Sequence, residues 1–291
     1  MADRLLSQKM GTGPEVTGWR HHAQGPRKNI TLFCLPGGGL TKDYFDLTPN
    51  YSFVDRMTAQ GYDIILCDHL GIASNAQNKD FPYFTPRDAA AYLSEQLRHW
   101  CGDSPVIGIG HSMGGMMIML MQGNHSPFKA LGLFGSSAGG LDWGLSKEEK
   151  NYINQEAMFA QDLEALSLAK FGAPYTRASG GPSGESIVFG GETQELTIRL
   201  RDISCEMNSA SAMMSMMRGS FRTEVEAIDV PIFFAFGDHD IGIPPEDAPK
   251  DYINAPSAEL VILENTGHNH FAFSSIQTLC EKLDYWASNL D

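Results

Sequence analysis

Short runs of β-branched and other apolar residues alternate along the chain with longer segments whose apolar residues recur at helical spacing. Such alternation predicts βαβ units, and therefore an α/β fold with a mainly parallel central sheet and helices on both faces. The predicted strands are residues 30–36, 63–69, 106–112, 130–137, 231–240 and 259–267, with an earlier strand near 15–22. The predicted helices are residues 43–60, 86–101, 113–123 and 274–289, with a short helix at 246–253.

This alternation stops between Gly139 and about Ala227, where no run predicts a buried strand. Residues 146–170 and 193–218 have helical patterning, and 178–191 is a connector rich in Gly, Ser and Pro. An unstructured linker is the alternative, but the two flanking segments are too apolar and periodic for it. We therefore expect a core formed by residues 1–139 and 228–291, and an inserted helical cap at residues 140–227.

Composition narrows the possible partners of this predicted fold. Apolar residues make up 42% of the 291 residues and the formal net charge is −14, with Lys and Arg scattered along the chain. Nucleic acids and anionic membranes bind to basic surfaces, so neither is an expected partner. The N-terminus has no apolar signal core and no segment reaches the length of a membrane span, which predicts a cytoplasmic protein. The five cysteines are widely spaced, and we expect them to be reduced thiols.

Two serines stand in the pattern Gly-x-Ser-x-Gly, Ser112 in GHSMGG and Ser137 in GSSAG. A nucleophilic serine of this kind sits on a sharp turn between a strand and a helix. Ser112 ends the apolar run VIGIG and directly precedes the apolar helical segment MGGMMIMLMQG, whereas the residues after Ser137, AGGLDWG, cannot begin a helix at once. Ser112 is therefore the predicted nucleophile, and Ser137 is expected to end a strand.

A serine nucleophile needs a base, and the base needs a carboxylate that fixes its tautomer. On a sheet of this kind these groups follow the serine in the order Asp or Glu, then His, beyond the ends of later strands. GDHDIGIP offers Asp238 and Asp240, and NTGHNHF offers His268 and His270. Asp240 is preferred because it lies further beyond the strand, and His268 because Gly267 frees the backbone before it.

The oxyanion of such a reaction needs backbone N–H donors. The N–H of Met113, next to the nucleophile, is one expected donor, and Gly37 or Gly38 in the loop PGGGL supplies the other. A phosphate-binding loop is the alternative for these glycines, but no Gly-Lys-Ser/Thr follows them. No metal site is predicted, because His268-Asn-His270 is the only His-x-His and lacks further ligands.

Together these motifs resemble the α/β-hydrolase family, and within it the capped, esterase-like branch. The resemblance rests on PGGGL, DHLGIAS (68–74), GHSMGG, GDHDIGIP and the TGH before Asn269, and it covers the cap by position only. Two positions depart from the pattern of the family: Pro36 stands where histidine is frequent, and Ala73 where glycine is usual. The dehalogenase and epoxide-hydrolase branches are disfavoured, because they carry an aspartate at the position of Ser112.

The resemblance and the triad together predict a serine hydrolase without a cofactor that transfers an acyl group to water. A carboxylic ester with a small, largely apolar body is the expected substrate. A thioester, a lactone and the carbon–carbon bond of a diketone are alternatives, and a non-catalytic receptor that kept the triad is another. The pathway and the oligomeric state are left open by the sequence.

Methionines cluster in two places, MMIMLM (116–121) and SAMMSMMR (211–218). Core packing explains the first cluster, which lies on a predicted buried helix. The second lies in the predicted cap, whose inner face borders the active-site cleft. Because methionine is unbranched and adaptable, this cluster predicts an apolar acyl or alcohol pocket. Its expected lining residues are Met213, Met214, Met216 and Met217.

Overall fold

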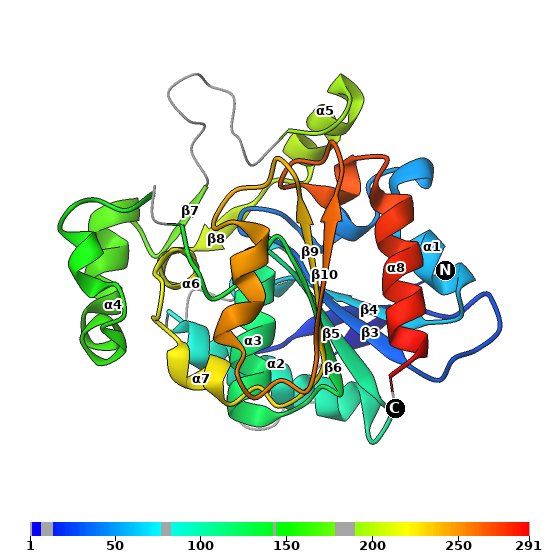
Figure 1. Ribbon diagram of the computed structural model, residues 1–291, viewed down its shortest axis with the longest axis horizontal. Helices are drawn as coiled ribbons and strands as arrows, with labels where there is room; N and C mark the ends of the chain where they lie inside the picture. Colours follow the sequence, from blue (N-terminus) through cyan, green and yellow to red (C-terminus); the bar gives the residue numbers. More distant parts are fainter. Residues whose placement is uncertain (1, 7–13, 77–82, 142–143, 178–189, 291) are drawn as a thin grey trace.

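A single large sheet forms the centre of the computed structural model, which describes residues 2–6, 14–76, 83–141, 144–177 and 190–290 (Figure 1). In this part of the chain eight strands follow one another in the order β1-β2-β4-β3-β5-β6-β9-β10. These strands are β1 Asp3–Leu6, β2 Thr17–His21, β3 Thr31–Leu35, β4 Asp63–Cys67, β5 Val106–His111, β6 Ala130–Phe134, β9 Ile232–Gly237 and β10 Ala258–Leu263.

Six neighbouring strands of this sheet run parallel to one another, which confirms the predicted mainly parallel sheet: β4, β3, β5, β6, β9 and β10. β2, the predicted early strand, pairs with β4 in the antiparallel sense, and β1 extends the sheet by pairing with β2. β1 was not predicted, because its four residues DRLL are too few and too exposed to give a pattern. Since the parallel strands share one direction, the loops after β3, β5, β6, β9 and β10 meet at one edge of the sheet.

Helices cover both faces of the sheet (Figure 1). α1 and α8 lie on one face, and α2, α3 and α7 lie on the other. In β3, Leu32 and Cys34 point into the cluster with α1 and α8, whereas Phe33 and Leu35 point into the cluster with α2 and α3. The bounds are α1 Phe53–Ala59, α2 Pro86–Cys101, α3 Met113–His125, α7 Arg222–Glu226 and α8 Ile276–Ser288.

Two predicted helices differ in kind from their expected form. The segment 43–60 contains two short 3₁₀-helices, Lys42–Phe45 and Pro49–Tyr51, before α1 begins. Ser52 starts α1 by accepting a hydrogen bond from the Asp55 N–H (2.9 Å), which sets the boundary. The segment 246–253 is a 3₁₀-helix, Pro245–Asp251. Proline interrupts the α-helical hydrogen bonds in such segments, and a 3.6-residue pattern alone does not reveal this.

The predicted cap contains helices and one small additional sheet. Among the described residues its elements are the 3₁₀-helix Glu149–Tyr152, α4 Glu156–Phe171, β7 Tyr175–Arg177, α5 Gln194–Asp202, β8 Glu206–Asn208, α6 Ser209–Met216 and α7. β7 pairs with β8 in the antiparallel sense, so the helical pattern expected over 193–218 is interrupted at β8. Most of the expected connector 178–191 lies outside the described residues. The domain boundaries at 139/140 and 227/228 stay a prediction.

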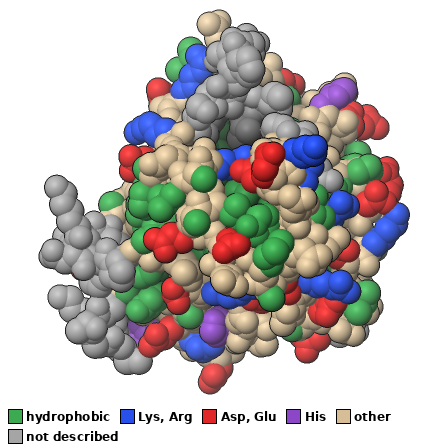
Figure 2. Space-filling view, turned by 90° about the vertical axis from the view of Figure 1, so that its left-hand side faces the viewer, with side chains coloured by type: hydrophobic (Ala, Val, Ile, Leu, Met, Phe, Trp, Pro, Cys, Tyr) green, Lys and Arg blue, Asp and Glu red, His purple; other side chains and the backbone are tan. Residues whose placement is uncertain are grey.

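The buried side chains of α4 form one stripe along the helix. Phe159, Leu163 and Ser167, spaced four residues apart, are buried, and α6 packs between α4 and α3. Met158 and Leu168 on other sides of α4 are exposed. Figure 2 looks onto this side of the molecule and shows acidic and basic side chains interspersed with apolar ones. Within the described ranges, no helix combines the length and apolar character that crossing a membrane requires.

Candidate active site

Ser112 stands at the turn where β5 ends and α3 begins. Its backbone has φ 51° and ψ −121°, a region that residues other than glycine rarely adopt. The Ser112 N–H donates a hydrogen bond to the carbonyl oxygen of Phe134 in β6 (2.9 Å). A strained, non-glycine turn residue held by its neighbours is typical of a functional site.

The glycines around Ser112 permit close contact between α3 and the sheet. A Cβ on Gly110 would lie 2.5 Å from the carbonyl oxygen of Gly114, and a Cβ on Gly114 would overlap the carbonyl oxygen of Leu35 in β3. Real Cβ contacts are almost never below 3.0 Å. Any larger residue at either position would push α3 away from the sheet and move Ser112.

Ser137 has a different local structure. It lies in the loop after β6, and its Oγ accepts a hydrogen bond from the Gly139 N–H (3.1 Å). Residues 138–141, the described residues that directly follow it, form no helix, as expected from the sequence. Ser137 lines the same cavity as Ser112 but lacks the strand-to-helix turn.

His268 and Asp240 meet at the edge of the sheet beyond β9 and β10. The Nδ1 of His268 lies 2.5 Å from Oδ1 of Asp240, and both side chains are almost completely buried. A carboxylate only accepts hydrogen bonds, so the proton of the neutral ring is on Nδ1 and Nε2 is free to act as a base. Within the described part of the chain, His268 Nε2 has no hydrogen-bond partner, and His268 and Ser112 line one cavity.

Asp240 is held as a carboxylate. Burial raises its pKa, but His268 and His270 outweigh this effect and hold the pKa of Asp240 well below its usual value. Its Oδ1 also accepts a hydrogen bond from the Ile241 N–H (2.7 Å). A buried negative charge beside two histidines is the environment that orients a catalytic imidazole.

Asp238, the competing aspartate, has a different set of partners. It accepts hydrogen bonds from the backbone N–H groups of Asn265 (2.8 Å) and Thr266 (2.9 Å). These donors lower the pKa of Asp238. Asp238 therefore joins the loop after β9 to the loop after β10, and Asp240 contacts His268.

The predicted oxyanion donors lie side by side at the turn. A Cβ on Gly37 would lie 3.3 Å from Cβ of Ser112, and a Cβ on Gly38 would lie 3.2 Å from Sδ of Met113. Met113 is the first residue of α3, so no residue of the helix accepts from its N–H. The glycine loop is anchored by His69, whose Nε2 donates to the Pro36 carbonyl oxygen (2.7 Å).

Two further histidines belong to this cluster, and no positioning role was predicted for either. His111, which directly precedes Ser112, donates from Nε2 to the carbonyl oxygen of His268 (2.7 Å). His270, considered only as an alternative base, donates from Nε2 to Oδ2 of Asp240 (2.7 Å). The signal in the sequence was their position: His111 directly precedes Ser112, and His270 lies two residues after His268.

The cavity beside Ser112 has a volume of about 40 Å³. This is room for a few water molecules and is smaller than usual ligand sites. Its described lining consists of Ser112, Met113, Met116, Gly135, Ser136, Ser137, Gly140, Leu141, Ser215, Phe236, Ile241, Gly242, Ile243 and His268.

The described residues that line this cavity do not include the four cap methionines. Met213, Met214 and Met217 are fully buried in the core cluster that includes α3. Met216 is partly buried and packs next to Gly144. The residue of α6 that lines the cavity is Ser215. The role of the methionines in a substrate pocket stays a prediction.

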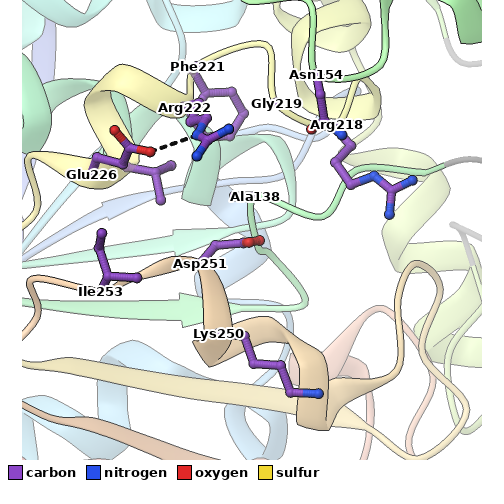
Figure 3. A pocket seen from close by; sticks show the side chains of 11 residues that line it. Ala138, Asn154, Arg218, Gly219, Phe221, Arg222, Glu226, Lys250, Asp251 and Ile253 are labelled. Carbon is purple, nitrogen blue, oxygen red and sulfur yellow. Dashed lines mark hydrogen bonds and ion pairs between the residues drawn. The ribbon is translucent and has the colours of Figure 1, made fainter.

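A second cavity, of about 440 Å³, opens between α7 and the 3₁₀-helix Pro245–Asp251 (Figure 3). Arg218, Arg222 and Lys250 border it, and Arg222 points toward Glu226, with which it forms an ion pair (2.6 Å). The described residues that line it include no serine, cysteine or histidine. The arrangement for nucleophilic chemistry is therefore in the smaller cavity.

Comparison with known proteins gives one family match and many structural matches. The model of a family described as "Alpha/beta hydrolase family" matches residues 32–275. A search of curated proteins gives no match.

Three of the similar solved structures illustrate the structural matches. A thermophilic esterase from Thermogutta terrifontis, with malate bound, is 14% identical, with a TM-score of 0.65 and coverage of 99% of each chain. A monoacylglycerol lipase from Paleococcus ferrophilus is 13% identical, with a TM-score of 0.67 and coverage of 94% of this chain and 99% of that chain. A thioesterase domain from the curacin biosynthetic pathway is 15% identical, with a TM-score of 0.65 and coverage of 98% and 99%. At these identities the matches show a shared fold, and they confirm the fold that the sequence resemblance implies.

Proposed function

Because this chain belongs to the alpha/beta hydrolase family, we propose that it is a serine hydrolase that cleaves a carboxylic ester through an acyl-enzyme on Ser112. The observation that carries the proposal is one shared cavity. It contains Ser112 on a strained turn and His268, whose Nδ1 is bonded to Asp240 and whose Nε2 has no partner among the described atoms. This is the set of groups that nucleophilic serine catalysis needs.

Acylation begins when Nε2 of His268 takes the proton of the Ser112 hydroxyl. The serine oxygen attacks the ester carbonyl carbon, and the carbonyl electron pair moves to its oxygen. As the tetrahedral intermediate collapses, His268 returns the proton to the departing alkoxide, and the alcohol leaves. Asp240 stabilises the imidazolium that exists between these two proton transfers.

The oxyanion of the intermediate is assigned to backbone donors. We assign the N–H of Met113 at the start of α3, and that of Gly37 or Gly38, to this role. The proximity of the glycine loop to Ser112 and Met113 supports the assignment. Donors fixed in a buried site stabilise developing charge without reorganising, and one such donor contributes about 3–4 kcal/mol to catalysis.

Deacylation follows the same steps with water as the nucleophile. His268 takes a proton from water, the hydroxide attacks the acyl carbon, and the collapse of the second intermediate returns the proton to Ser112. The free carboxylic acid leaves. No cofactor and no metal take part in this scheme, since every proton and electron pair moves between the named groups, water and the ester.

The proposed substrate is a small molecule with a largely apolar body. Met113, Met116, Leu141, Phe236 and Ile243 supply apolar surface around Ser112. The four cap methionines are proposed to extend this surface when α6 shifts to admit a larger group. We propose a cytoplasmic enzyme with no nucleic-acid or membrane partner, in keeping with a formal net charge of −14.

Labelling with a fluorophosphonate probe tests the proposal. Peptide mapping is expected to find the label on Ser112, and Ser112→Ala is expected to abolish both labelling and the turnover of p-nitrophenyl esters. Ser137→Ala is the matched control in the same cavity, and it should still be labelled. Label on Ser137 would overturn the site assignment.

A substrate panel decides among the other reactions that the same triad could perform. Esters, thioesters, lactones and a β-diketone are compared by kcat/KM, and the ester is expected to lead. A protein that binds these compounds but turns over none of them is a receptor, and the hydrolase proposal then fails.

A further inference from the structure

Asp240 forms hydrogen bonds with two buried histidines, one through each carboxylate oxygen. Oδ1 lies 2.5 Å from Nδ1 of His268, and Oδ2 lies 2.7 Å from Nε2 of His270. His270 is the first residue of a 3₁₀-helix, His270–Ala272, and its side chain is completely buried. The proposed acyl transfer needs only the first of these two bonds.

The second bond fixes the rotation of the carboxylate. Torsions between an sp³ and an sp² carbon are broad, so an aspartate carboxylate is not held by its own rotamer preference. Oδ1 is held by His268 and by the Ile241 N–H at 2.7 Å. Oδ2 is held by His270 and by the Gly237 N–H, which is distant at 3.3 Å. Without His270, the Oδ2 side of the carboxylate would keep only the weaker bond.

The surroundings of His270 also define its tautomer. Its Nε2 faces a carboxylate and must donate, while its Nδ1 is buried without a hydrogen-bond partner among the described atoms. When the ring is neutral, its single proton is therefore on Nε2.

We propose that His270 is a positioning residue, which locks Asp240 in the rotation that keeps Oδ1 on His268. The proposal rests on the proposed hydrolase function. His270 is absent from the described lining of the cavity, so it acts through Asp240 and not on the substrate. Its loss should therefore lower kcat and leave KM unchanged.

Two substitutions test this role. His270→Phe keeps a ring but removes the donor, and His270→Gln keeps an N–H donor near Asp240. A bond to a charged group contributes enough that His270→Phe should lower kcat for a p-nitrophenyl ester by about 10- to 100-fold. His270→Gln should restore kcat to within about threefold of the wild type, since the hydrogen bond to Asp240 is retained.

His239→Gln is the matched control, because His239 lies in the same loop as Asp240 but its side chain is 76% exposed. Its kcat should equal that of the wild type. A folded His270→Phe protein with unchanged kcat would overturn the proposal, as would a His270→Gln protein as slow as His270→Phe.

A spectroscopic measurement on the wild type tests the proposal without substitution and without turnover. In ¹⁵N-labelled protein, the nitrogen shifts of His270 should show a tautomer that carries a proton on Nε2. A ring whose proton is on Nδ1, with none on Nε2, contradicts the proposed bond. If no ester is turned over but this tautomer is found, the hydrolase proposal fails and the structural part of the inference stands.

Discussion

His111 is bonded through Nε2 to the carbonyl oxygen of His268 at 2.7 Å. His111 directly precedes Ser112, so this bond joins the strand that carries the proposed nucleophile to the loop that carries the proposed base. Burial above all, and then His268 and His270 nearby, lower the pKa of His111 well below its usual value. His111 is therefore neutral, with its proton on the nitrogen that donates.

His111→Phe should lower both stability and kcat. The ring is retained beside Tyr44, with which His111 packs at 4.6 Å between ring centroids, but the buried His268 carbonyl loses its donor. An unsatisfied buried acceptor costs about 1–3 kcal/mol, which urea unfolding would detect. We expect kcat to fall about tenfold, because the His268 backbone is no longer tied to the turn. Unchanged kcat in a destabilised but folded protein would limit His111 to a role in stability.

Asp240→Asn and Asp238→Asn should differ strongly in their effect on turnover. Asp240→Asn removes the carboxylate that fixes the His268 tautomer, and should lower kcat by about 10³- to 10⁴-fold. Asp238 contacts backbone N–H groups and not His268, so its replacement should have a mild effect. Steady-state kinetics on both variants with one activated ester makes the comparison. The opposite ranking would move the proposed acid to Asp238.

The local sequence pattern was enough to predict most of the fold and the positions of the proposed triad residues along the chain. The turn at Ser112 was predictable because a strand, a glycine-flanked serine and a helix are consecutive in sequence. Asp240 and His268 were predictable because both follow parallel strands, whose ends share one edge of the sheet.

The positioning histidines were not predictable, because their roles depend on contacts between distant segments. His111 acts through a carbonyl 157 residues away, and His270 through an aspartate 30 residues away. The position of the methionines of α6 relative to the substrate was also not predictable from the sequence. An apolar residue on a cap helix has the same pattern whether it faces substrate or the core, and Met213 and Met214 are fully buried in the core.

Ala73→Gly should stabilise the protein. Ala73 is exposed and has φ 45°, in the left-handed region, which costs a residue other than glycine about 1–2 kcal/mol. The greater freedom of glycine in the unfolded chain offsets part of this gain. The expected net increase in the free energy of unfolding is about 0.5–1 kcal/mol, measured by urea titration.

Ala76→Gly is the matched control for this strain. Ala76 lies in the same turn and is also exposed, but its φ is −58°. Glycine there relieves no strain and should destabilise the protein. Equal effects of the two substitutions would show that the backbone at Ala73 is not strained in solution.

The protein should lose stability between pH 7 and pH 5. Burial lowers the pKa of both His69 and His111, so each stays neutral to a lower pH in the folded state than in the unfolded chain. In the unfolded chain each binds a proton below its ordinary pKa of about 6.5, so the unfolded state is favoured as the pH falls. The free energy of unfolding should drop by up to about 1.4 kcal/mol per pH unit for each histidine.

Urea titrations at pH 8, 7, 6 and 5 measure this loss. The lowered pKa of Asp240 acts in a separate window, because its contribution is present above the ordinary Asp pKa of about 4 and is lost only below it. His69→Gln keeps a donor for Pro36 but cannot titrate, and should make the slope below pH 6.5 shallower. Equal stability at pH 7 and pH 5 would show that these histidines are protonated without unfolding.

The acyl-chain preference should be set by Met116 in α3. In the described geometry Met116 lines the cavity beside Ser112, whereas Met214 is fully buried in the core. Met116→Ala adds volume next to the nucleophile, so it should shift the preferred p-nitrophenyl ester toward longer acyl groups. Each further CH₂ that becomes buried is worth up to about 0.8 kcal/mol, or roughly fourfold in kcat/KM. Met214→Ala should lower the free energy of unfolding by about 2–5 kcal/mol and leave the preference unchanged among esters short enough to bind without a shift of α6.

A series of esters from acetate to octanoate, run on the wild type and both variants, separates the two possible pockets. A cavity of about 40 Å³ admits only a short acyl group unless α6 moves. If α6 does move, Met213, Met214, Met216 and Met217 reach the substrate, and Met214→Ala then alters the preference while Met116→Ala alters it less. A wild type that prefers acetate to every longer ester, with no change in either variant, would contradict an apolar acyl pocket altogether. In that event the α6 methionines pack the core, and the apolar body of the substrate must lie on the alcohol side of the ester.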